Sequence, residues 1–282
     1  FLGMFRAMDG LPVIVRLLDP PLHEFLESPR ALDVEIAKLE ATGGDKALIA
    51  EKRMLMEQID GMSEANPMLG LRGCRLGIVY PILPVMQVRA IATACAELQK
   101  EGLNPKPEIM IPLVSVVAEL EKLRKVAEDT IAEVAAEQGV ELDIPVGTMI
   151  ELPRAAVTAD EIGAVADFFS FGTNDLTQTT FGFSRDDVEA KFIPRYLERR
   201  ILPCNPFETV DAGVAALVDM GLHEGAAPRT RTSSWACAAS TAATPPVWSS
   251  STGRAWIMCP ALPSGCPSPG WLRHRLPSRT SK

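Results

Sequence analysis

Two carboxylates stand at the ends of two short apolar segments near the middle of the chain. Val146–Ile150 leads into Glu151, and Phe168–Phe171 leads into Gly172-Thr-Asn-Asp175. Apolar residues recur with helical spacing between these segments, which predicts one helix over 154–167. A strand, a helix and a strand in this order form a βαβ unit, whose chemistry lies at the carboxyl ends of its strands. The spacing therefore predicts that Glu151 and Asp175 lie close together.

Two carboxylates at adjacent strand ends suit a hard cation, above all Mg²⁺, which also takes substrate oxygens and water as ligands. The alternative is that a polar side chain after a strand only caps the next helix. For Asn174 or Asp175 taken alone, capping is the commoner role. Glu151 and Asp175 together, beside a Gly-Thr-Asn-Asp loop, favour a metal site with these two residues as ligands.

Arginines near strand ends and glycine-containing loops are candidates for binding an anion, because a guanidinium group matches the geometry of phosphate. They are Arg16 at the end of the segment 11–19, Arg72 and Arg75 in the loop 66–75, and Arg185 in the segment 180–187. Arg16 has an alternative as a strand residue whose long side chain reaches solvent. Arg72 and Arg75 have one as partners of surface acids, which is the commoner role for either taken alone.

Short apolar segments alternate with helical ones along most of the chain. We predict strands at 11–19, 107–114, 146–150 and 168–171, and helices at 86–100, 117–138 and 207–221. A polar helical stretch over 31–62 is broken at Gly43-Gly44. Such alternation predicts an α/β fold with a parallel sheet, whose closed form is the (β/α)₈ barrel of TIM type.

The totals restrict the class of protein. A chain of 282 residues is long enough for one barrel or two domains. No apolar run reaches membrane-spanning length and the first residues lack the layout of a signal peptide, so we expect no membrane segment. The six cysteines lack metal-type pairs, which is typical of free thiols in a reducing compartment such as the cytoplasm. Because the first residue is not Met, we expect a piece of a longer protein.

Charge and composition change sharply near residue 225. No Asp or Glu follows Glu224, so the last part of the chain carries seven of the 28 basic residues and none of the 36 acidic ones. Residues 1–225 are left with a net charge of -15, which argues against nucleic acid as a partner. Residues 226–282 contain eight Pro, no Phe and no Tyr, without helical or strand periodicity. We expect this tail to be irregular and disordered.

Five segments, in this order, resemble the C-terminal domain of the pyruvate, phosphate dikinases, a family of phosphoenolpyruvate-utilising enzymes. They are Leu17-Leu-Asp-Pro-Pro-Leu-His-Glu-Phe25, Asn66-Pro-Met-Leu-Gly-Leu-Arg-Gly-Cys-Arg75, Pro107-Glu-Ile-Met-Ile-Pro112, Gly147-Thr-Met-Ile-Glu-Leu-Pro153 and Ser170-Phe-Gly-Thr-Asn-Asp-Leu-Thr-Gln178. The Asp19–Phe25 and Thr180–Asp187 segments are those of the dikinases rather than of phosphoenolpyruvate synthase or enzyme I of the sugar phosphotransferase system. The resemblance covers residues 1 to about 225.

The resemblance implies a barrel that binds phosphoenolpyruvate and pyruvate, and a Mg²⁺-dependent transferase that makes phosphoenolpyruvate, AMP and diphosphate from ATP, pyruvate and phosphate. Glu151 and Asp175 match its metal ligands. The residues that match its substrate contacts are Arg16 and Arg72 for the phosphoryl group, Gly172, Thr173, Asn174 and Asp175 near the metal, and Arg185 for a further anion contact. Position and charge would then provide most of the catalysis.

The resemblance also implies partner domains that residues 1–282 do not include. In the family, a phosphohistidine on a swivelling domain delivers the phosphoryl group, and ATP and phosphate react at an ATP-grasp domain. The first barrel strand, with an arginine of its own, would lie upstream of Phe1. We expect the full-length parent to be a homodimer. The barrel is thus expected to be incomplete, with its first strand absent and its last two strands replaced by the tail.

The tail departs from the family in a specific way. Residues 231–245 and 256–267 correspond to the family's continuation read one nucleotide late in GC-rich codons. We therefore predict a reading-frame slip near codons 226–231, with a barrel segment over 1–225 and an out-of-frame tail over 226–282. The family's acid/base cysteine is split between the codons of Pro260 and Ala261. No catalytic residue is assigned, and Cys259 does not inherit the role.

Two alternatives remain at this point. One is another enzyme of the same superfamily, a phosphoenolpyruvate synthase or an enzyme I, against which the Asp19–Phe25 segment argues. The other is a non-catalytic interaction protein whose tail, bearing all four Trp, contacts a partner. That reading requires the tail to become ordered on binding, whereas the frame slip explains the tail without a partner.

Overall fold

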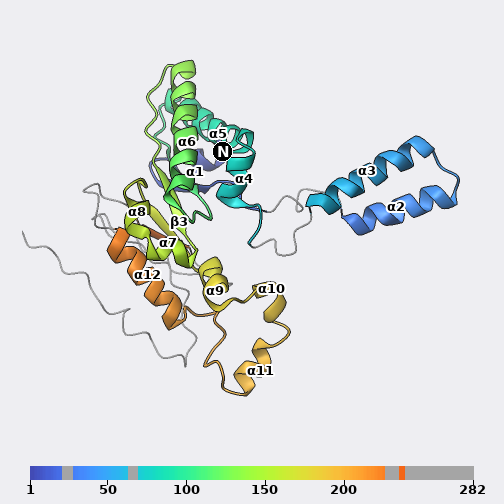
Figure 1. Cartoon of the computed structure of the whole chain (residues 1–282). Helices are drawn as coiled ribbons and strands as arrows, with labels where there is room; N and C mark the ends of the chain where they lie inside the picture. The colour runs from blue at the N-terminus through green and yellow to red at the C-terminus, as the bar shows by residue number, and fades with distance from the viewer. Residues whose placement is uncertain (21–27, 63–68, 226–234, 239–282) are drawn as a thin grey trace, which may run out of the picture. The chain divides into compact units, whose positions relative to one another are not determined.

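The computed structural model of the chain describes residues 1–20, 28–62, 69–225 and 235–238 (Figure 1). It divides into two compact units. Unit 1 consists of Phe1–Leu113 with Lys122–Ile144, and unit 2 consists of Val114–Glu121 with the chain from Pro145 onward.

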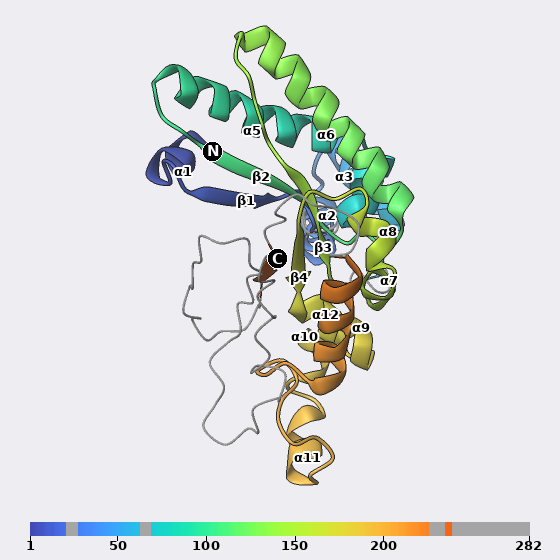
Figure 2. The ribbon, with the colours of Figure 1, turned by 90° about the vertical axis from the view of Figure 1, so that its left-hand side faces the viewer.

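Unit 1 is built on two parallel strands. Strand β1 (Pro12–Arg16) pairs with β2 (Lys106–Ile111) so that Pro12 lies opposite Lys106 and Arg16 opposite Met110, and Figure 2 shows the two side by side. Pro107, Ile109 and Ile111 are buried on one face of β2, as expected of a strand that packs under helices. Strand β1 lies within the predicted segment 11–19, which was one residue too long at its start and three at its end. Strand β2 begins one residue before the predicted segment 107–114 and ends three residues before its end.

Helices connect and cover these strands. Helix α1 (Leu2–Ala7) packs against α5 (Ile82–Lys100), which follows the short α4 (Gly73–Val79) and leads into β2. The predicted apolar face of α5 is confirmed, because Val88, Ile91, Ala92, Cys95 and Leu98 are all buried. Helix α6 (Val117–Gln138) has the predicted bounds. At its start the Glu119 carboxylate accepts hydrogen bonds from the Ser115 hydroxyl and amide and from the Val116 amide.

The polar stretch between β1 and β2 forms two helices that pack against each other. Helices α2 (Pro29–Ala41) and α3 (Lys46–Met62) are separated at the predicted break. Gly43 has a φ of +68° there, a conformation that suits glycine. Two ion pairs join the helices, Arg53 with Glu40, which is exposed, and Lys52 with Glu35, in which Lys52 is partly buried.

Unit 2 contains the predicted βαβ unit. Strand β3 (Val146–Ile150) pairs in parallel with β4 (Phe169–Gly172), and every residue of both strands is buried. The prediction of one helix over 154–167 is wrong, because α7 (Pro153–Val157) and α8 (Ala159–Gly163) are separate helices. Thr158 lies between them with φ -114° and ψ 34°, and its hydroxyl donates to the Arg154 carbonyl. A Thr side chain that bonds the backbone in this way competes with a regular helix.

Helix α12 (Ala212–Gly225) packs along α7, α8 and α9 (Thr173–Phe181). The predicted helix over 207–221 begins too early, since the structure starts it at Ala212. Phe207 instead packs in a small apolar cluster with Val188 and Ile193, which belong to α10 (Arg185–Val188) and α11 (Ile193–Glu198). Gly221 allows α12 to approach β4, because a Cβ at this position would lie 2.9 Å from Cε1 of Phe171.

The tail over 226–282 was expected to be irregular throughout, and this expectation is wrong at one place, where four residues form a strand. Trp235–Ala238 form strand β5, which pairs in parallel with β4. Strand pairing uses backbone groups, so a sheet edge can accept a segment whose side chains show no strand periodicity. The other tail residues from 239 onward, and 226–234, lie outside the described residues.

The fold is thus α/β, with parallel strands that alternate with helices as in an incomplete (β/α)₈ barrel. Among the described residues, no single helix is both long and apolar enough to span a membrane. Helices α4 and α5 meet that length and hydropathy only as a pair bent by 106°.

Candidate functional site

Glu151 directly follows β3 and is fully buried, with 0% of the residue exposed. The next helix, α7, has Leu152 as its N-cap residue and no side-chain cap, so the carboxylate does not serve as a helix cap. Its Oε2 atom is buried and accepts no hydrogen bond from the described residues, although Glu151 interacts elsewhere. A buried carboxylate is costly unless positive charge or hydrogen bonds compensate it.

Gly172 ends β4 and lies directly against the Glu151 side chain. A Cβ at this position would lie 2.6 Å from Oε2 of Glu151 and 2.8 Å from Sδ of Met149. These contacts leave room only for glycine, so the backbone at the end of β4 meets the carboxylate at the end of β3. The two strand ends thus meet, as their parallel pairing requires, whereas the closeness of Glu151 and Asp175 themselves stays a prediction.

Helix α9 starts immediately after Gly172, and Asn174 and Asp175 lie in its first turn. Gly172 is the N-cap residue, and no side chain caps the helix. The capping alternative for Asn174 and Asp175 is therefore not what the structure contains. A carboxylate in this turn is favoured by the helix dipole, and the first backbone N–H groups of a helix are available to an anionic ligand.

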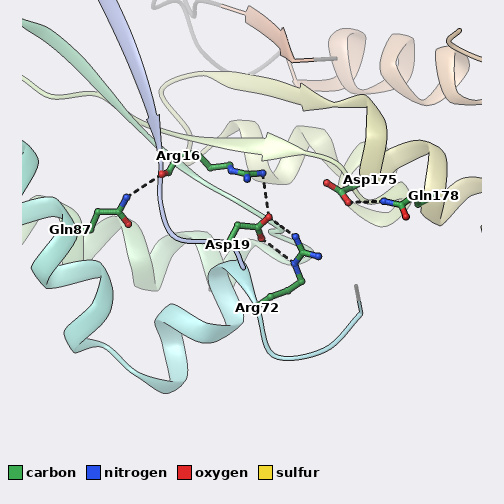
Figure 3. A network of polar contacts seen from close by, with 6 residues as sticks. All are labelled: Arg16, Asp19, Arg72, Gln87, Asp175 and Gln178. Atoms are coloured by element: carbon green, nitrogen blue, oxygen red, sulfur yellow. Dashed lines mark hydrogen bonds and ion pairs between the residues drawn. The ribbon is translucent and has the colours of Figure 1, made fainter. Parts of the chain in front are cut away.

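A chain of hydrogen bonds joins Asp175 to Arg185 through Gln178. Gln178 Nε2 donates to Asp175 Oδ1 at 3.2 Å, and the Arg185 backbone N–H donates to Gln178 Oε1 at 2.9 Å. Figure 3 shows the Gln178 amide directed at the Asp175 carboxylate. Gln178 itself is 7% exposed.

The Arg185 side chain lies beside the same turn of α9. Its Nη1 donates to Asn174 Oδ1 at 3.2 Å, its Nε donates to Glu189 Oε1 at 3.3 Å, and its Cζ lies 5.6 Å from the centre of the Phe207 ring. The structure thus brings together Asn174, Asp175 and Arg185. Gln178 was not predicted as a site residue, although its i+3 spacing from Asp175 on a helix was a signal that the sequence offered.

Unit 1 holds a second polar cluster, formed by Arg16, Asp19 and Arg72 (Figure 3). Arg72 donates to both oxygens of the Asp19 carboxylate, and Arg16 Nη1 lies 3.3 Å from Asp19 Oδ2. Asp19 is 3% exposed and Arg72 is 9% exposed, whereas the Arg16 side chain is 44% exposed. Arg72 thus pairs with an acid, but with a buried one rather than with the surface acids of the alternative. The pair of guanidinium groups around one carboxylate keeps a net positive charge.

Two further residues fix the backbone of this cluster. Gln87 on α5 accepts a hydrogen bond from the Leu18 amide at 2.8 Å and donates to the Arg16 carbonyl at 3.2 Å. Gly73 has a φ of +56°, and a Cβ there would lie 2.8 Å from Cβ of Leu113 and 3.0 Å from Oδ1 of Asp19. Glycine at 73 thus lets Arg72 approach Asp19. Neither Asp19 nor Gln87 was predicted as a site residue.

Comparison with known proteins identifies the class of this domain. Residues 1–231 match the family described as PEP-utilising enzyme, PEP-binding domain, where PEP is phosphoenolpyruvate. The chain belongs to this family of PEP-utilising enzymes. The match includes both polar clusters, and it accounts for the barrel-type alternation of parallel strands and helices.

Among curated relatives, the chain is similar to pyruvate, phosphate dikinases. It is 49% identical to the enzyme of Giardia intestinalis over 231 residues, which are 82% of this chain and 25% of the relative. It is 53% identical to the chloroplastic enzyme of Flaveria trinervia over 228 residues, and 52% identical to the chloroplastic dikinase 1 of Arabidopsis thaliana over 234 residues, each covering 23% of the relative. The chain therefore spans about a quarter of the length of these relatives.

The residues of the PEP-binding domain suit a divalent cation. The described part of the chain has no cluster of three or more His, Cys, Asp or Glu side chains placed to hold a metal. Mg²⁺, however, is bound by one or two carboxylates and completes its octahedron with water and substrate oxygens. The chain offers two carboxylates of this kind, Glu151 directly after β3 and Asp175 in the first turn of α9, and the Glu151 side chain lies against Gly172, the N-cap residue of α9.

Proposed function

We propose that this chain is the phosphoenolpyruvate- and pyruvate-binding part of a pyruvate, phosphate dikinase, and that it binds its substrate together with Mg²⁺. The observation that carries the proposal is the Glu151 carboxylate, fully buried against Gly172 at the start of the helix that bears Asp175. The relatives named above, at about half identity, supply the substrate class.

In the proposed site, Glu151 and Asp175 hold the metal, which supplies charge stabilisation for the substrate oxygens when it is bound. Gly172 at the N-cap of α9, with Thr173 and Asn174 in its first turn, presents backbone and amide groups to the substrate. Arg185, held beside Asn174, adds a positive charge for the substrate anion.

For the cluster in unit 1, taken by itself, we propose the binding of a phosphoryl group. Arg16 and Arg72 carry two guanidinium groups, and Asp19 orients them while neutralising one of the two charges. Forked donors of this kind suit phosphate oxygens. Phosphoryl transfer is catalysed chiefly by such positioning and charge stabilisation.

Binding of phosphoenolpyruvate tests the proposal directly. Isothermal titration calorimetry of the purified chain should detect phosphoenolpyruvate only when Mg²⁺ is present. Asp175→Asn and Glu151→Gln should each abolish the Mg²⁺-dependent binding of phosphoenolpyruvate. Glu57→Gln, on the exposed face of α3, should leave that binding unchanged. Binding that is equally tight without Mg²⁺, or in the Asp175→Asn variant, would contradict the proposed site.

The phosphohistidine domain, the homodimer and the overall reaction belong to the full-length parent in this proposal. We infer that the chain by itself binds its substrate but does not catalyse the reaction. The reason is that the family's acid/base cysteine, which would protonate the pyruvate carbon, is lost through the predicted frame slip. The expected result is no exchange of the pyruvate methyl protons in deuterated water with Mg²⁺, followed by NMR. Exchange catalysed by the purified chain would show that it has its own acid/base group.

A further inference from the structure

We propose that Gln178 is a positioning residue that couples the Asp175 carboxylate to the segment carrying Arg185. The inference rests on the proposed function, since it assigns Asp175 to the metal and Arg185 to the substrate anion. Gln178 lies one turn after Asp175 on α9 and is almost fully buried, with 7% of the residue exposed.

The two hydrogen bonds of Gln178 fix which way its amide faces. The Arg185 backbone N–H can only donate, so the atom that it meets at 2.9 Å must be the amide oxygen, Oε1. The amide nitrogen, Nε2, is therefore the group that faces Asp175 Oδ1 at 3.2 Å. An NH₂ group can only donate, so this orientation selects an accepting carboxylate oxygen on Asp175.

This arrangement makes one side chain responsible for two parts of the site. On one side it holds Oδ1 of Asp175, which sets the orientation of the carboxylate toward the proposed metal ion. On the other side it holds the start of α10, where Arg185 in turn contacts Asn174 at 3.2 Å. Substitution of a residue that orients a metal ligand in this way weakens metal affinity by about 10–100-fold.

The main-chain carbonyl of Gln178 has a separate structural role. It accepts hydrogen bonds from the amides of Gly182 and Phe183, which close the C-terminal end of α9. These bonds do not involve the side chain. A substitution at 178 can therefore remove the coupling to Asp175 and Arg185 while the helix end stays intact.

Gln178→Met tests the inference, because Met has a similar length and lacks both the donor and the acceptor. With Mn²⁺ as the probe, electron paramagnetic resonance of the free ion should show affinity about tenfold weaker than in the wild type. The matched control is Thr179→Val, which removes hydrogen bonds from the Thr179 hydroxyl to the main-chain carbonyls of Asp175 and Leu176 only. It should bind Mn²⁺ within about twofold of the wild type.

Amide hydrogen exchange measured by NMR gives a second readout that is independent of metal. In Gln178→Met the Arg185 amide should exchange faster, while the Gly182 and Phe183 amides keep their protection. Gln178→Glu retains an acceptor for the Arg185 N–H and should keep that amide protected. If Gln178→Met does not fold, loss of Arg185 protection in Gln178→Glu overturns the inference.

The outcomes separate this inference from the proposed function. If the wild type binds Mn²⁺ and Asp175→Asn does not, but Gln178→Met matches the wild type in affinity and in Arg185 exchange, the coupling is wrong and the metal site stands. If all three amides lose protection in Gln178→Met, the residue is merely structural and the inference is overturned. If the wild type and Asp175→Asn bind Mn²⁺ equally, the proposed function itself fails.

Discussion

Arg72 donates to both carboxylate oxygens of Asp19, from Nη2 to Oδ2 at 2.6 Å and from Nε to Oδ1 at 3.3 Å. The two residues are 53 positions apart and both are buried. Removing one partner of a buried ion pair leaves the other charge uncompensated, which costs far more than the pair contributes by itself. The pair therefore has consequences for stability as well as for binding an anion.

Asp19→Asn should lower the free energy of unfolding by about 3–5 kcal/mol, since the buried guanidinium of Arg72 loses the carboxylate that compensates it. Urea denaturation followed by circular dichroism measures the loss. The control is Glu40→Gln, which breaks an exposed pair with Arg53 and should cost less than about 1 kcal/mol. Similar losses in the two variants would mean that the Asp19 pair is not buried as described.

The sequence predicted best those elements whose residues are strongly patterned along the chain. The bounds of α6 and β3 agree with the prediction residue for residue. The break between α7 and α8 was missed because it depends on the conformation of Thr158 rather than on apolar spacing. The start of α12 was missed because the apolar Phe207 packs against Val188 and Ile193 rather than belonging to the helix. Strand β5 was missed because strand pairing depends on backbone groups.

The candidate site shows the same division. Glu151 and Asp175 were proposed from their places after strands, and the structure places both there. Their role as metal ligands stays a prediction, as does the anion contact of Arg16, Arg72 and Arg185. The partners Asp19 and Gln87 were not predictable, because a contact between residues 53 or 69 positions apart is not visible in one sequence.

Gly172→Ala should impair the metal site by displacing the Glu151 carboxylate, whose Oε2 would lie 2.6 Å from the new Cβ. We expect a loss of about 1–3 kcal/mol in stability from the overlap, and at least tenfold weaker Mn²⁺ binding. Thermal unfolding and Mn²⁺ titration measure the two effects. Gly61→Ala is the control, because a Cβ there meets nothing within 4 Å. Unchanged Mn²⁺ affinity in Gly172→Ala would argue against Glu151 as a ligand.

Cys95 should resist alkylation in the folded protein. Burial raises the pKa of its thiol to about 11, so little reactive thiolate is present at pH 8.5. The partly exposed Cys204 provides the comparison within the same chain. Iodoacetamide labelling quantified by mass spectrometry should modify Cys204 before Cys95, and the difference should vanish in urea. Equal labelling of both thiols in the native protein would show that α5 opens readily.

Glu108→Gln should stabilise the fold at neutral pH. Burial raises the pKa of Glu108 on β2 above its ordinary value. The folded state therefore binds more protons than the unfolded state between these two values, and stability falls as pH rises through that window. The penalty in the wild type therefore grows as pH rises through that window, and below the ordinary pKa of glutamate, about 4.3, it is absent. Melting temperatures at pH 7 and pH 4 should thus show a gain for Glu108→Gln only at pH 7.

The control for this prediction is Glu57→Gln, on the exposed face of α3, which should show no such pH-dependent gain. A gain for Glu108→Gln of equal size at both pH values would contradict the desolvation of Glu108.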